Sequence, residues 1–333
     1  MIAMEQQGWP LQAQGEPTSG GVDVAGTGFT VLDRLYADGG KMSEALGGSC
    51  GNVLVSLAML SRTVAPVLAL GCDEVGDQLV ETFHAAGADT RYIARRREIA
   101  SPILAQQLDI VSGQHWFSFV CPETEEKLPR YTSIDVQDVE HAVDVINGCS
   151  VFYADRLSEA IIDAMETAAN AGALVYFEPS AIDDIDLLSR ALRLTRILKY
   201  SSDRLEDIVG ASQLRSDAIL IVTHGADGLE LRQQGASAWC QAIRAPRVRD
   251  TCGSGDMVTV GIIDWILDRT ARDYESWTLD NLMGGVVAGQ RLAAANCAYA
   301  GARGLFARND LSMVRRILSG DMAPFDLQMD LFD

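Results

Sequence analysis

Long apolar runs are missing from this sequence, and so is a secretory leader. Nowhere do apolar residues continue for the roughly 18 to 20 positions that a membrane-spanning helix needs. The first twenty residues, MIAMEQQGWPLQAQGEPTSG, contain neither a basic start nor an apolar stretch of the kind that a signal peptide carries. We therefore expect a cytoplasmic protein in which residues 1–20 form a flexible tail.

Paired cysteines and histidine clusters are also missing. The seven cysteines are odd in number, scattered, and never spaced as C-x-x-C. The four histidines show no spacing typical of metal ligands. This pattern excludes a disulfide framework and a zinc cluster, and it favours a reducing compartment.

Basic residues are scarce relative to acidic ones. The chain has 27 lysines and arginines against 46 aspartates and glutamates, which gives a net charge of −19. Such a charge repels nucleic acid and anionic membranes, and solubility is its simplest explanation. A phosphate-bearing ligand would have to be captured locally, by backbone amides, a bound cation or a few placed arginines.

What the chain does contain is a regular alternation of short β-rich runs and longer helical ones over residues 21–333. The expected strands are 22–27, 66–70, 151–154, 174–177, 196–199 and 219–223. The expected helices are 53–61, 76–86, 157–171, 185–194, 256–267 and 282–297. Several strands are continuously apolar, as strands buried on both faces are. The alternation predicts an α/β fold of three layers, a mostly parallel sheet with helices on both faces.

Two stretches, 29–46 and 101–120, depart from this alternation. Both mix polar and apolar residues without a helical period, and the second reads as a β-hairpin with aromatic residues after Gly113. We interpret them as a small β appendage, which would serve as a lid or a dimer contact, or would simply pack on the core.

The most informative segment is 250–256, which reads DTCGSGD and runs into an apolar helix. Gly253 and Gly255 let a ligand approach the backbone, and the first amides of the helix point outward with the positive end of the helix dipole behind them. Such a bend can hold an anion, and the carboxylate of Asp256 beside it can accept a proton from an attacking hydroxyl. The alternative is plain capping, with Ser254 as the N-cap and Asp256 complementing the dipole.

Two further segments are weaker signals. Residues 46–52, LGGSCGN, lead into a helix with Asn52 in its first turn, and an amide there can both donate to and accept from a polyol hydroxyl. Residues 223–228, THGADG, follow a strand end, where α/β sheets usually bind ligands. Taken alone, each is more typical of a local turn.

Together, the order and spacing of these segments resemble the ribokinase-like (PfkB) carbohydrate kinase family over nearly the whole chain after residue 20. The N-terminal signature of that family, a double glycine followed four residues later by Asn, is matched by Gly47, Gly48 and Asn52. Its C-terminal signature, Asp-Thr-x-Gly-Ala/Ser-Gly-Asp, is matched by residues 250–256 without a mismatch. Supporting matches are Gly28 with Asp33, then Gly71, Asp73 and Gly76, and finally Thr223, Gly225 and Gly228.

The resemblance implies ATP-dependent phosphorylation of a hydroxyl group on a small sugar or nucleoside. Asp256 would be the general base, and Gly253, Ser254 and Gly255 would form the anion hole. The acceptor would be held by Asp33, Gly47, Gly48 and Asn52. The nucleotide would be lined by Thr223, Gly225, Gly228 and Asn296. Asp250 and Thr251 would bind a monovalent cation, K⁺, and the two β stretches would form a lid that pairs subunits into a homodimer.

One departure from the family concerns magnesium. The family commonly places Asn-x-x-Glu after the strand expected at 196–199, where this chain has Ser201 and Arg204. Mg²⁺ still follows from the reaction class, because the charge of the phosphoryl group must be neutralised. The residues that would replace the missing acid are left open by the sequence: Glu178, Asp203, Glu206 or Asp207, or Arg204 by meeting a phosphate directly.

Two other functions compete with this one. A nicotinamide-dependent dehydrogenase would need a third glycine after Gly26 and Gly28, but that position is Val31. A non-catalytic sugar- or nucleotide-sensing protein of the same fold would explain Ser201 and Arg204, although it has little need for an acid beside a phosphate site. The acceptor itself stays open, since Arg34, Lys41 or Arg130 could meet a phosphate already on it or could be surface charges.

Overall fold

The computed structural model describes residues 21–37, 40–108, 115–180, 182–205, 214–269 and 276–327. The tail predicted at residues 1–20 lies outside the described residues.

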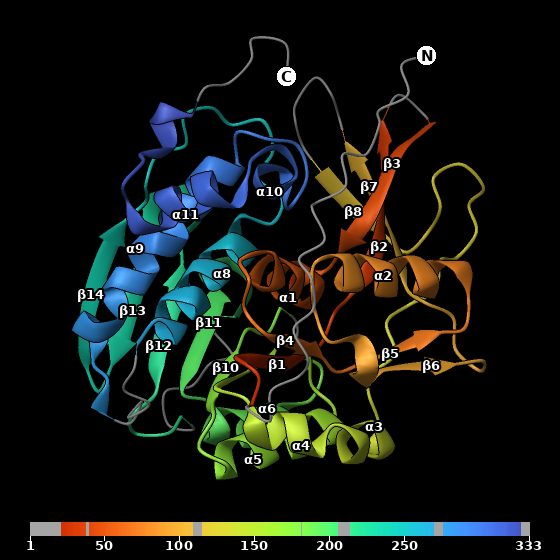
Figure 1. The fold of residues 1–333 in the computed structure, drawn as a ribbon, viewed down its shortest axis with the longest axis horizontal. Helices are drawn as coiled ribbons and strands as arrows, with labels where there is room; N and C mark the ends of the chain where they lie inside the picture. The colour runs from red at the N-terminus through yellow and green to blue at the C-terminus, as the bar shows by residue number, and fades with distance from the viewer. Residues whose placement is uncertain are drawn as a thin grey trace.

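An eight-stranded sheet runs through the middle of the molecule (Figure 1). Its strands are β1 (Val24–Thr27), β4 (Val64–Pro66), β9 (Val151–Ala154), β10 (Leu174–Phe177), β11 (Ile197–Ser201), β12 (Ile219–Thr223), β13 (Gly228–Gln233) and β14 (Ala236–Gln241). Their order is β14-β13-β12-β11-β10-β9-β1-β4. Pairing is parallel from β12 to β4 and antiparallel from β12 to β14.

The central strands are apolar on both faces because each face is covered. On β9, Tyr153 packs into one hydrophobic core and Phe152 into the other, and on β10 Tyr176 and Phe177 divide in the same way. Successive side chains of a strand point to opposite faces, so a strand between two layers must be continuously apolar. The prediction of a mostly parallel sheet between two helical layers is confirmed.

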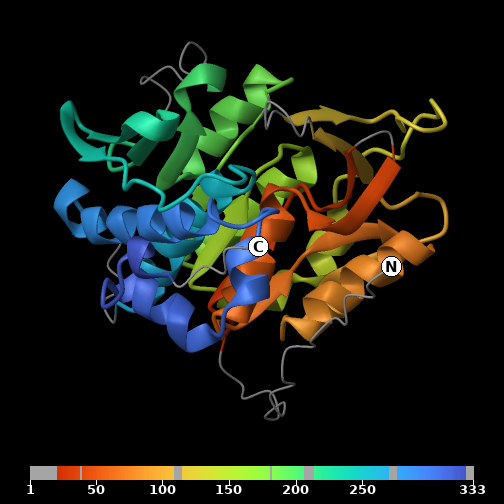
Figure 2. The same ribbon diagram turned by 90° about the horizontal axis from the view of Figure 1, so that it is seen from above.

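The helices form a layer on each face of the sheet (Figures 1 and 2). One layer contains α1 (Ser49–Met59), α2 (Glu74–Ala85), α8 (Ser254–Leu267), α9 (Leu279–Asn296), α10 (Gly304–Arg308) and α11 (Leu311–Ser319). The other contains α3 (Val136–His141), α4 (Val143–Gly148), α5 (Glu159–Asn170) and α6 (Ile185–Leu194). A short helix, α7 (Ser202–Leu205), follows β11.

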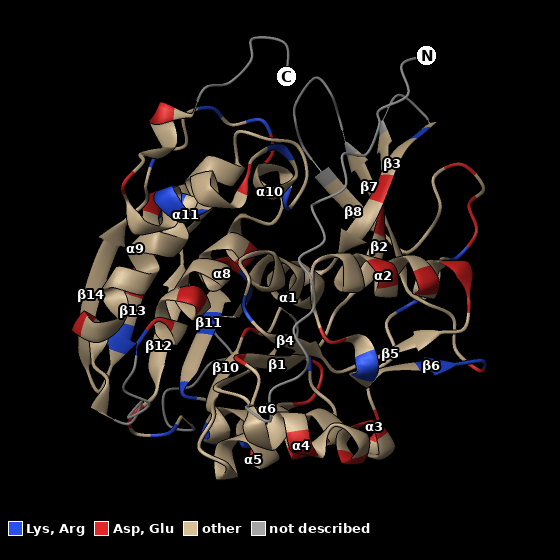
Figure 3. Ribbon diagram, in the orientation of Figure 1, with Lys and Arg blue, Asp and Glu red and all other residues tan. Residues whose placement is uncertain are grey.

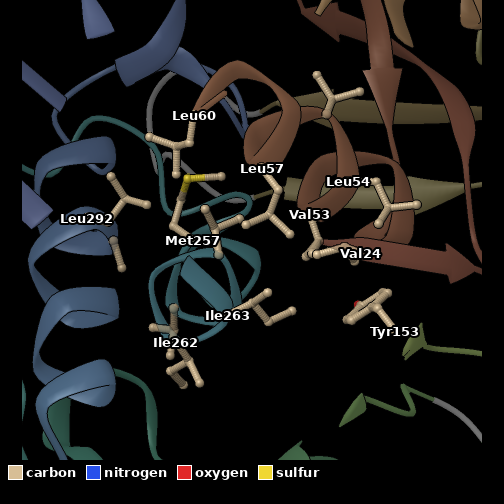
Figure 4. Packing of buried hydrophobic residues seen from close by; sticks show 14 of the residues in the cluster. Val24, Val53, Leu54, Leu57, Leu60, Tyr153, Met257, Ile262, Ile263 and Leu292 are labelled. Atoms are coloured by element: carbon tan, nitrogen blue, oxygen red, sulfur yellow. The ribbon is translucent and has the colours of Figure 1, made fainter. Parts of the chain in front are cut away.

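Close packing fixes α8 between α1 and α9. Leu57 of α1, Met257 of α8 and Leu292 of α9 lie in one buried cluster (Figure 4). Farther along, α8 and α9 approach so closely that a Cβ added to Gly261 would lie 2.4 Å from the Cα of Gly289. Helices packed this closely have little room to move, so the first turn of α8 has a fixed position relative to α1.

A second, four-stranded sheet stands apart from the main one (Figures 1 and 2). It contains β2 (Val31–Ala37), β3 (Gly40–Gly47), β7 (Ile103–Leu108) and β8 (His115–Ser118), in the order β3-β2-β7-β8. These strands come from the two stretches that the sequence singles out, 29–46 and 101–120. The expected hairpin is confirmed, because β7 and β8 pair antiparallel, although its tip at 109–114 lies outside the described residues.

The strand predicted at 66–70 is divided between two strands of different sheets. β4 ends at Pro66, and β5 (Leu68–Gly71) pairs instead with β6 (Ile93–Arg96) in a separate two-stranded sheet. Pro66 has no amide proton to donate to the ladder, and the chain turns away after the amide of Val67 donates to the carbonyl of Gly26 at 2.8 Å. The short helices α3, α4, α10 and α11 were not predicted either.

The surface is acidic, in keeping with the net charge of −19. Acidic residues are spread along the helices of both layers and the small sheet (Figure 3). Within the described ranges, none of the helices is both long and apolar enough to span a membrane.

Candidate active site

The first turn of α8 is built around Gly253. This residue is the N-cap of the helix and has φ 73°, in the left-handed region that favours glycine. A Cβ here would also lie 2.6 Å from the Cβ of Ala302. Among the described residues no side chain caps α8, so the alternative in which Ser254 is an ordinary N-cap is wrong. Gly255 is exposed, and amides at this helix end are available to an anion.

Asp256 lies in that first turn and contacts α1. Its Oδ2 accepts a hydrogen bond from Nδ2 of Asn52 at 2.8 Å, so the two glycine-rich segments meet although 204 residues separate the pair. Burial, together with the negative charge of Glu178, raises the pKa of Asp256 to about 7, while Asn52 and Lys199 act in the opposite direction. A carboxylate with this pKa is suited to take up and release a proton near neutral pH.

Glu178 and Lys199 form a buried ion pair beside Asp256. Glu178 follows β10, Lys199 lies on β11, and the Lys199 ammonium donates to Oε1 of Glu178. Oε2 of Glu178 accepts from the hydroxyl of Thr259 at 2.5 Å and from that of Tyr153 at 3.4 Å. A Cβ on Gly255 would lie 3.7 Å from Nζ of Lys199, which places this ammonium at the first turn of α8.

The residues predicted to hold the acceptor lie together at the other side of Asp256. A Cβ on Gly47 would lie only 1.8 Å from Oδ2 of Asp33, so the chain passes directly beside that carboxylate. Burial raises the pKa of Asp33 to about 7, against the opposing effect of Arg303. Oδ1 of Asp33 and Oδ1 of Asn52 are buried and have no hydrogen-bond partner among the described residues. Unpartnered buried oxygens of this kind are typical of a site that awaits a polar ligand.

Asp155, at the carboxyl end of β9, holds the two acceptor segments in place. Its Oδ1 accepts from the amide of Phe29 at 2.7 Å, and its Oδ2 accepts from the amide of Cys50 at 3.0 Å. The side chain is completely buried. Sequence analysis missed this residue, although an acid directly after an apolar strand is a usable signal.

The predicted nucleotide residues do not all converge. Thr223 ends β12, Gly228 begins β13, and Gly225 lies in the turn between them, at the carboxyl edge of β12. Asn296 is fully buried in α9, where its Nδ2 donates to the carbonyl of Ala302 at 3.1 Å and its Oδ1 accepts from the amide of Leu305 at 3.0 Å. Its side chain therefore positions the 297–305 segment, and its contact with the nucleotide stays a prediction.

A sequence profile described as pfkB family carbohydrate kinase matches residues 29–304. The chain belongs to this family. The kinase is a phosphotransferase with an alcohol group as acceptor. A fructokinase from Klebsiella pneumoniae is 26% identical over 262 residues, which cover 71% of this chain and 81% of that protein. An aminoimidazole riboside kinase from Salmonella typhimurium is 26% identical over 240 residues, which cover 65% and 72%.

The fold agrees with that of solved kinases. A crystal structure of a fructokinase with bound ATP, from Xylella fastidiosa, has a TM-score of 0.73 and 21% sequence identity, and the match covers 90% of this chain and 98% of that chain. At this level of identity the likeness shows the ribokinase-like fold.

Two cation sites are expected for the kinase, one for Mg²⁺ and one for K⁺. For each, we ask whether the residues present could bind the ion. Glu178 raises the pKa of both Asp155 and Asp256, so this part of the site has an excess of negative charge that a divalent cation would relieve. No three acidic, histidine or cysteine side chains among the described residues are arranged to hold a metal ion by themselves, so Mg²⁺ would need phosphate oxygens as further ligands. For K⁺, both oxygens of Asp250 already accept backbone amides, those of Cys252 and Gly301, each at 2.8 Å. Both Asp250 oxygens thus stabilise the backbone around the turn, and the K⁺ site at Asp250 and Thr251 stays a prediction.

The residues considered in place of the missing family acid are now placed. Asp203 and Arg204 are exposed on α7, whereas Glu178 lies in the site. Glu206 and Asp207 lie outside the described residues. Lys199 was missed by sequence analysis, and its only signal is a lysine inside an apolar strand.

Proposed function

We propose that this kinase phosphorylates a hydroxyl group of a small sugar or nucleoside with ATP, using Asp256 as the general base and the first turn of α8 as the anion hole. The observation that carries the proposal is the hydrogen bond from Asn52 to Asp256, because it joins the predicted acceptor segment to an uncapped helix N-terminus at a carboxylate of pKa about 7. The names of two relatives, a fructokinase and an aminoimidazole riboside kinase, support a sugar or riboside as acceptor.

The proposed reaction begins with the acceptor hydroxyl beside Asp256. Its proton passes to the carboxylate, its oxygen forms a bond to the terminal phosphorus of ATP, and the bond from that phosphorus to the bridging oxygen breaks, so that ADP leaves. The amide of Gly255 would face the negative charge of the transferring group, and the helix dipole favours that charge, whereas the amide of Ser254 donates to the carbonyl of Thr251 at 3.2 Å. Asn52 holds the Asp256 carboxylate in position for this proton transfer.

The nucleotide and its magnesium are assigned to neighbouring residues. The 223–228 loop would line ATP, and support for ATP comes from the Xylella fastidiosa fructokinase, whose structure contains it. Magnesium would be held by Glu178 together with phosphate oxygens, and it would neutralise phosphoryl charge. Lys199 contributes a fixed positive charge at the same helix end.

We also propose that two copies of the kinase pair through the small sheet. Trp116 and Phe117 of β8 are 51% and 55% exposed, and Met42 of β3 is 63% exposed. Exposed apolar side chains on one short sheet are typical of a surface that another protein covers.

The test of the proposed function is a screen for ADP formation from ATP with neutral sugars, nucleosides and sugar phosphates, each with and without Mg²⁺. The proposal predicts ADP formation that depends on both the acceptor and Mg²⁺. A sensing protein of the same fold would bind ligand without turnover. If no compound of the panel gives acceptor-dependent ADP, the sensing function is favoured over the kinase function.

A further inference from the structure

Arg303 is a partly buried arginine that joins the phosphate side of the site to its acceptor side. It is the N-cap of α10 and directly follows Ala302, the residue that packs against Gly253. Its Nη2 donates to the carbonyl of Leu46 at 2.9 Å, immediately before the double glycine. The guanidinium therefore lies where the 301–303 turn, the small sheet and the start of α1 meet.

The other end of this guanidinium has no partner among the described residues. Nη1 of Arg303 is buried and makes no hydrogen bond to any described residue, and the same is true of Oδ1 of Asp33. The charge of Arg303 opposes the rise in the pKa of Asp33, so the two groups act on each other across the site. Burial lowers the pKa of Arg303 to about 10, which still leaves it positively charged at neutral pH. A buried arginine donor without a partner is rare in a finished protein interior and indicates a missing ligand atom.

We propose that Arg303 is an acceptor-binding residue, which together with Asp33 clamps a hydroxyl group of an uncharged polyol. The inference rests on the proposed function and deepens it. One hydroxyl can donate its proton to Oδ1 of Asp33 and accept a proton from Nη1 of Arg303 at the same time, so a single sugar oxygen would satisfy both unpartnered atoms. Bonds of this kind to charged groups are stronger than neutral ones, so the pair would select a particular hydroxyl position.

The charges of the site favour a neutral acceptor over a phosphorylated or carboxylated one. Asp33 and Asp256 are two acids facing one guanidinium, since Arg303 acts electrostatically on both. An anionic substituent on the acceptor would be repelled by two carboxylates and attracted by one guanidinium.

The basic residues considered for a substrate phosphate are already engaged. Arg34 and Lys41 each pair with Glu44 at 3.2 Å. Arg130 lies over the ring of Phe119 at 5.1 Å. None of these three residues therefore supplies the site with a second cation that could bind an anionic group of the acceptor.

The test compares Arg303→Met and Arg303→Lys with a matched control, Arg315→Met. Arg315 likewise donates to a backbone carbonyl, that of Leu60 at the opposite end of α1, and to the carboxylate of Asp264. For whichever of D-fructose, D-ribose or adenosine the wild type phosphorylates, Arg303→Met should raise the acceptor KM about 10- to 100-fold and leave the ATP KM within about twofold. Arg303→Lys should recover only part of the loss, because an ammonium does not reproduce the guanidinium fork. Arg315→Met should lower the melting temperature and leave both KM values unchanged.

Analogues of the same acceptor that lack one hydroxyl separate binding from a structural effect. In the wild type, one monodeoxy analogue should lose about 10-fold or more in kcat/KM, and the same analogue should cost Arg303→Met less than about threefold. If every analogue costs both proteins the same, or if Arg303→Met has an unchanged acceptor KM, the inference is wrong.

Charged probes test the choice of acceptor class. Fructose 6-phosphate and gluconate should be phosphorylated at least about 100-fold less efficiently than the best neutral acceptor. A preference for either that disappears in Arg303→Met would overturn the assignment to an uncharged polyol.

If nothing on the panel is phosphorylated, the proposed function fails, and calorimetric binding of the same sugars tests the inference separately. Weaker binding by Arg303→Met than by Arg315→Met would support it, and equal or absent binding would contradict it.

Discussion

At the scale of the residue, the acids of the site repel one another, and hydrogen-bond donors and positive charges reduce this repulsion. Burial and Glu178 raise the pKa of Asp256, and the hydrogen bond from Asn52 together with the charge of Lys199 limits the rise. The outcome is a pKa of about 7, at which a general base is both available and strong enough to be useful.

The pH profile follows from this balance. A general base must be deprotonated, so kcat/KM should fall as pH drops below about 7, the pKa of Asp256, and level off above it. Asn52→Ala removes the donor that stabilises the carboxylate, and it should move the acidic limb of the profile to higher pH. Asn170→Ala, at the exposed end of α5, is the control and should not shift it. An unshifted limb in Asn52→Ala would contradict the role of this hydrogen bond.

At the scale of the element, the first turn of α8 combines a glycine that the fold requires with a glycine that has open space beside it. Gly253 has a positive φ and no room for a Cβ, whereas within the described ranges a Cβ on Gly255 would have a single near neighbour, Nζ of Lys199 at 3.7 Å. The first glycine sets the shape of the turn, and the second leaves its outer side open.

The two glycines should therefore respond differently to substitution. Gly253→Ala should lower the free energy of unfolding by about 1–3 kcal/mol, because it combines backbone strain with a clash against Ala302. Gly255→Leu should keep most of the stability and lose at least about 100-fold in kcat, because its side chain would cover the anion hole. Denaturant unfolding and steady-state kinetics on both variants give the comparison. Full activity in Gly255→Leu would argue against an anion hole here.

Much of this element-scale structure could be predicted from the sequence, for physical reasons. Strands 151–154, 174–177 and 219–223 were predicted with correct bounds, because a strand buried on both faces is apolar throughout. The predicted helix starts were less accurate. α1 begins at Ser49 and α8 at Ser254, and both first turns contain glycines and polar residues, which have a low helix propensity.

The site was predicted only where the sequence carries a local motif. Asp256, Asn52 and Asp33 stand in or near glycine-rich segments, and the structure brings them together. Lys199 and Arg303 stand alone in the sequence, and their roles arise from contacts with Glu178 and Leu46, which are 21 and 257 residues away. Contacts between residues so far apart in the chain follow from the tertiary fold and leave no local pattern.

At the scale of the whole molecule, one rigid layer carries the chemistry and a separate sheet borders it. Apolar packing joins α1, α8 and α9 (Figure 4), and the hydrogen bond from Asn52 to Asp256 links α1 to α8, while β2 and β3 carry Asp33 and Gly47 from the small sheet. A change in the small sheet should therefore affect acceptor binding more than phosphoryl transfer.

Pairing through the small sheet predicts a change in mass. Sedimentation of the wild type should give the mass of a dimer, and Trp116→Arg with Phe117→Arg should give that of a monomer, because the charges would be buried without partners. Phe325→Arg is the control, since Phe325 is 57% exposed but lies near the C-terminus, away from this sheet. A monomeric wild type would contradict the pairing.

The central claim is that the carboxylate of Asp256 takes the proton of the acceptor beside the first turn of α8. It is tested most directly by Asp256→Asn, which keeps the size of the side chain and removes the base, with Asp280→Asn in the exposed first turn of α9 as the matched control. Turnover in acceptor-dependent ADP formation should fall about 10²- to 10⁴-fold in Asp256→Asn, with little change in nucleotide affinity, and should be normal in Asp280→Asn. Full turnover in Asp256→Asn would contradict the account.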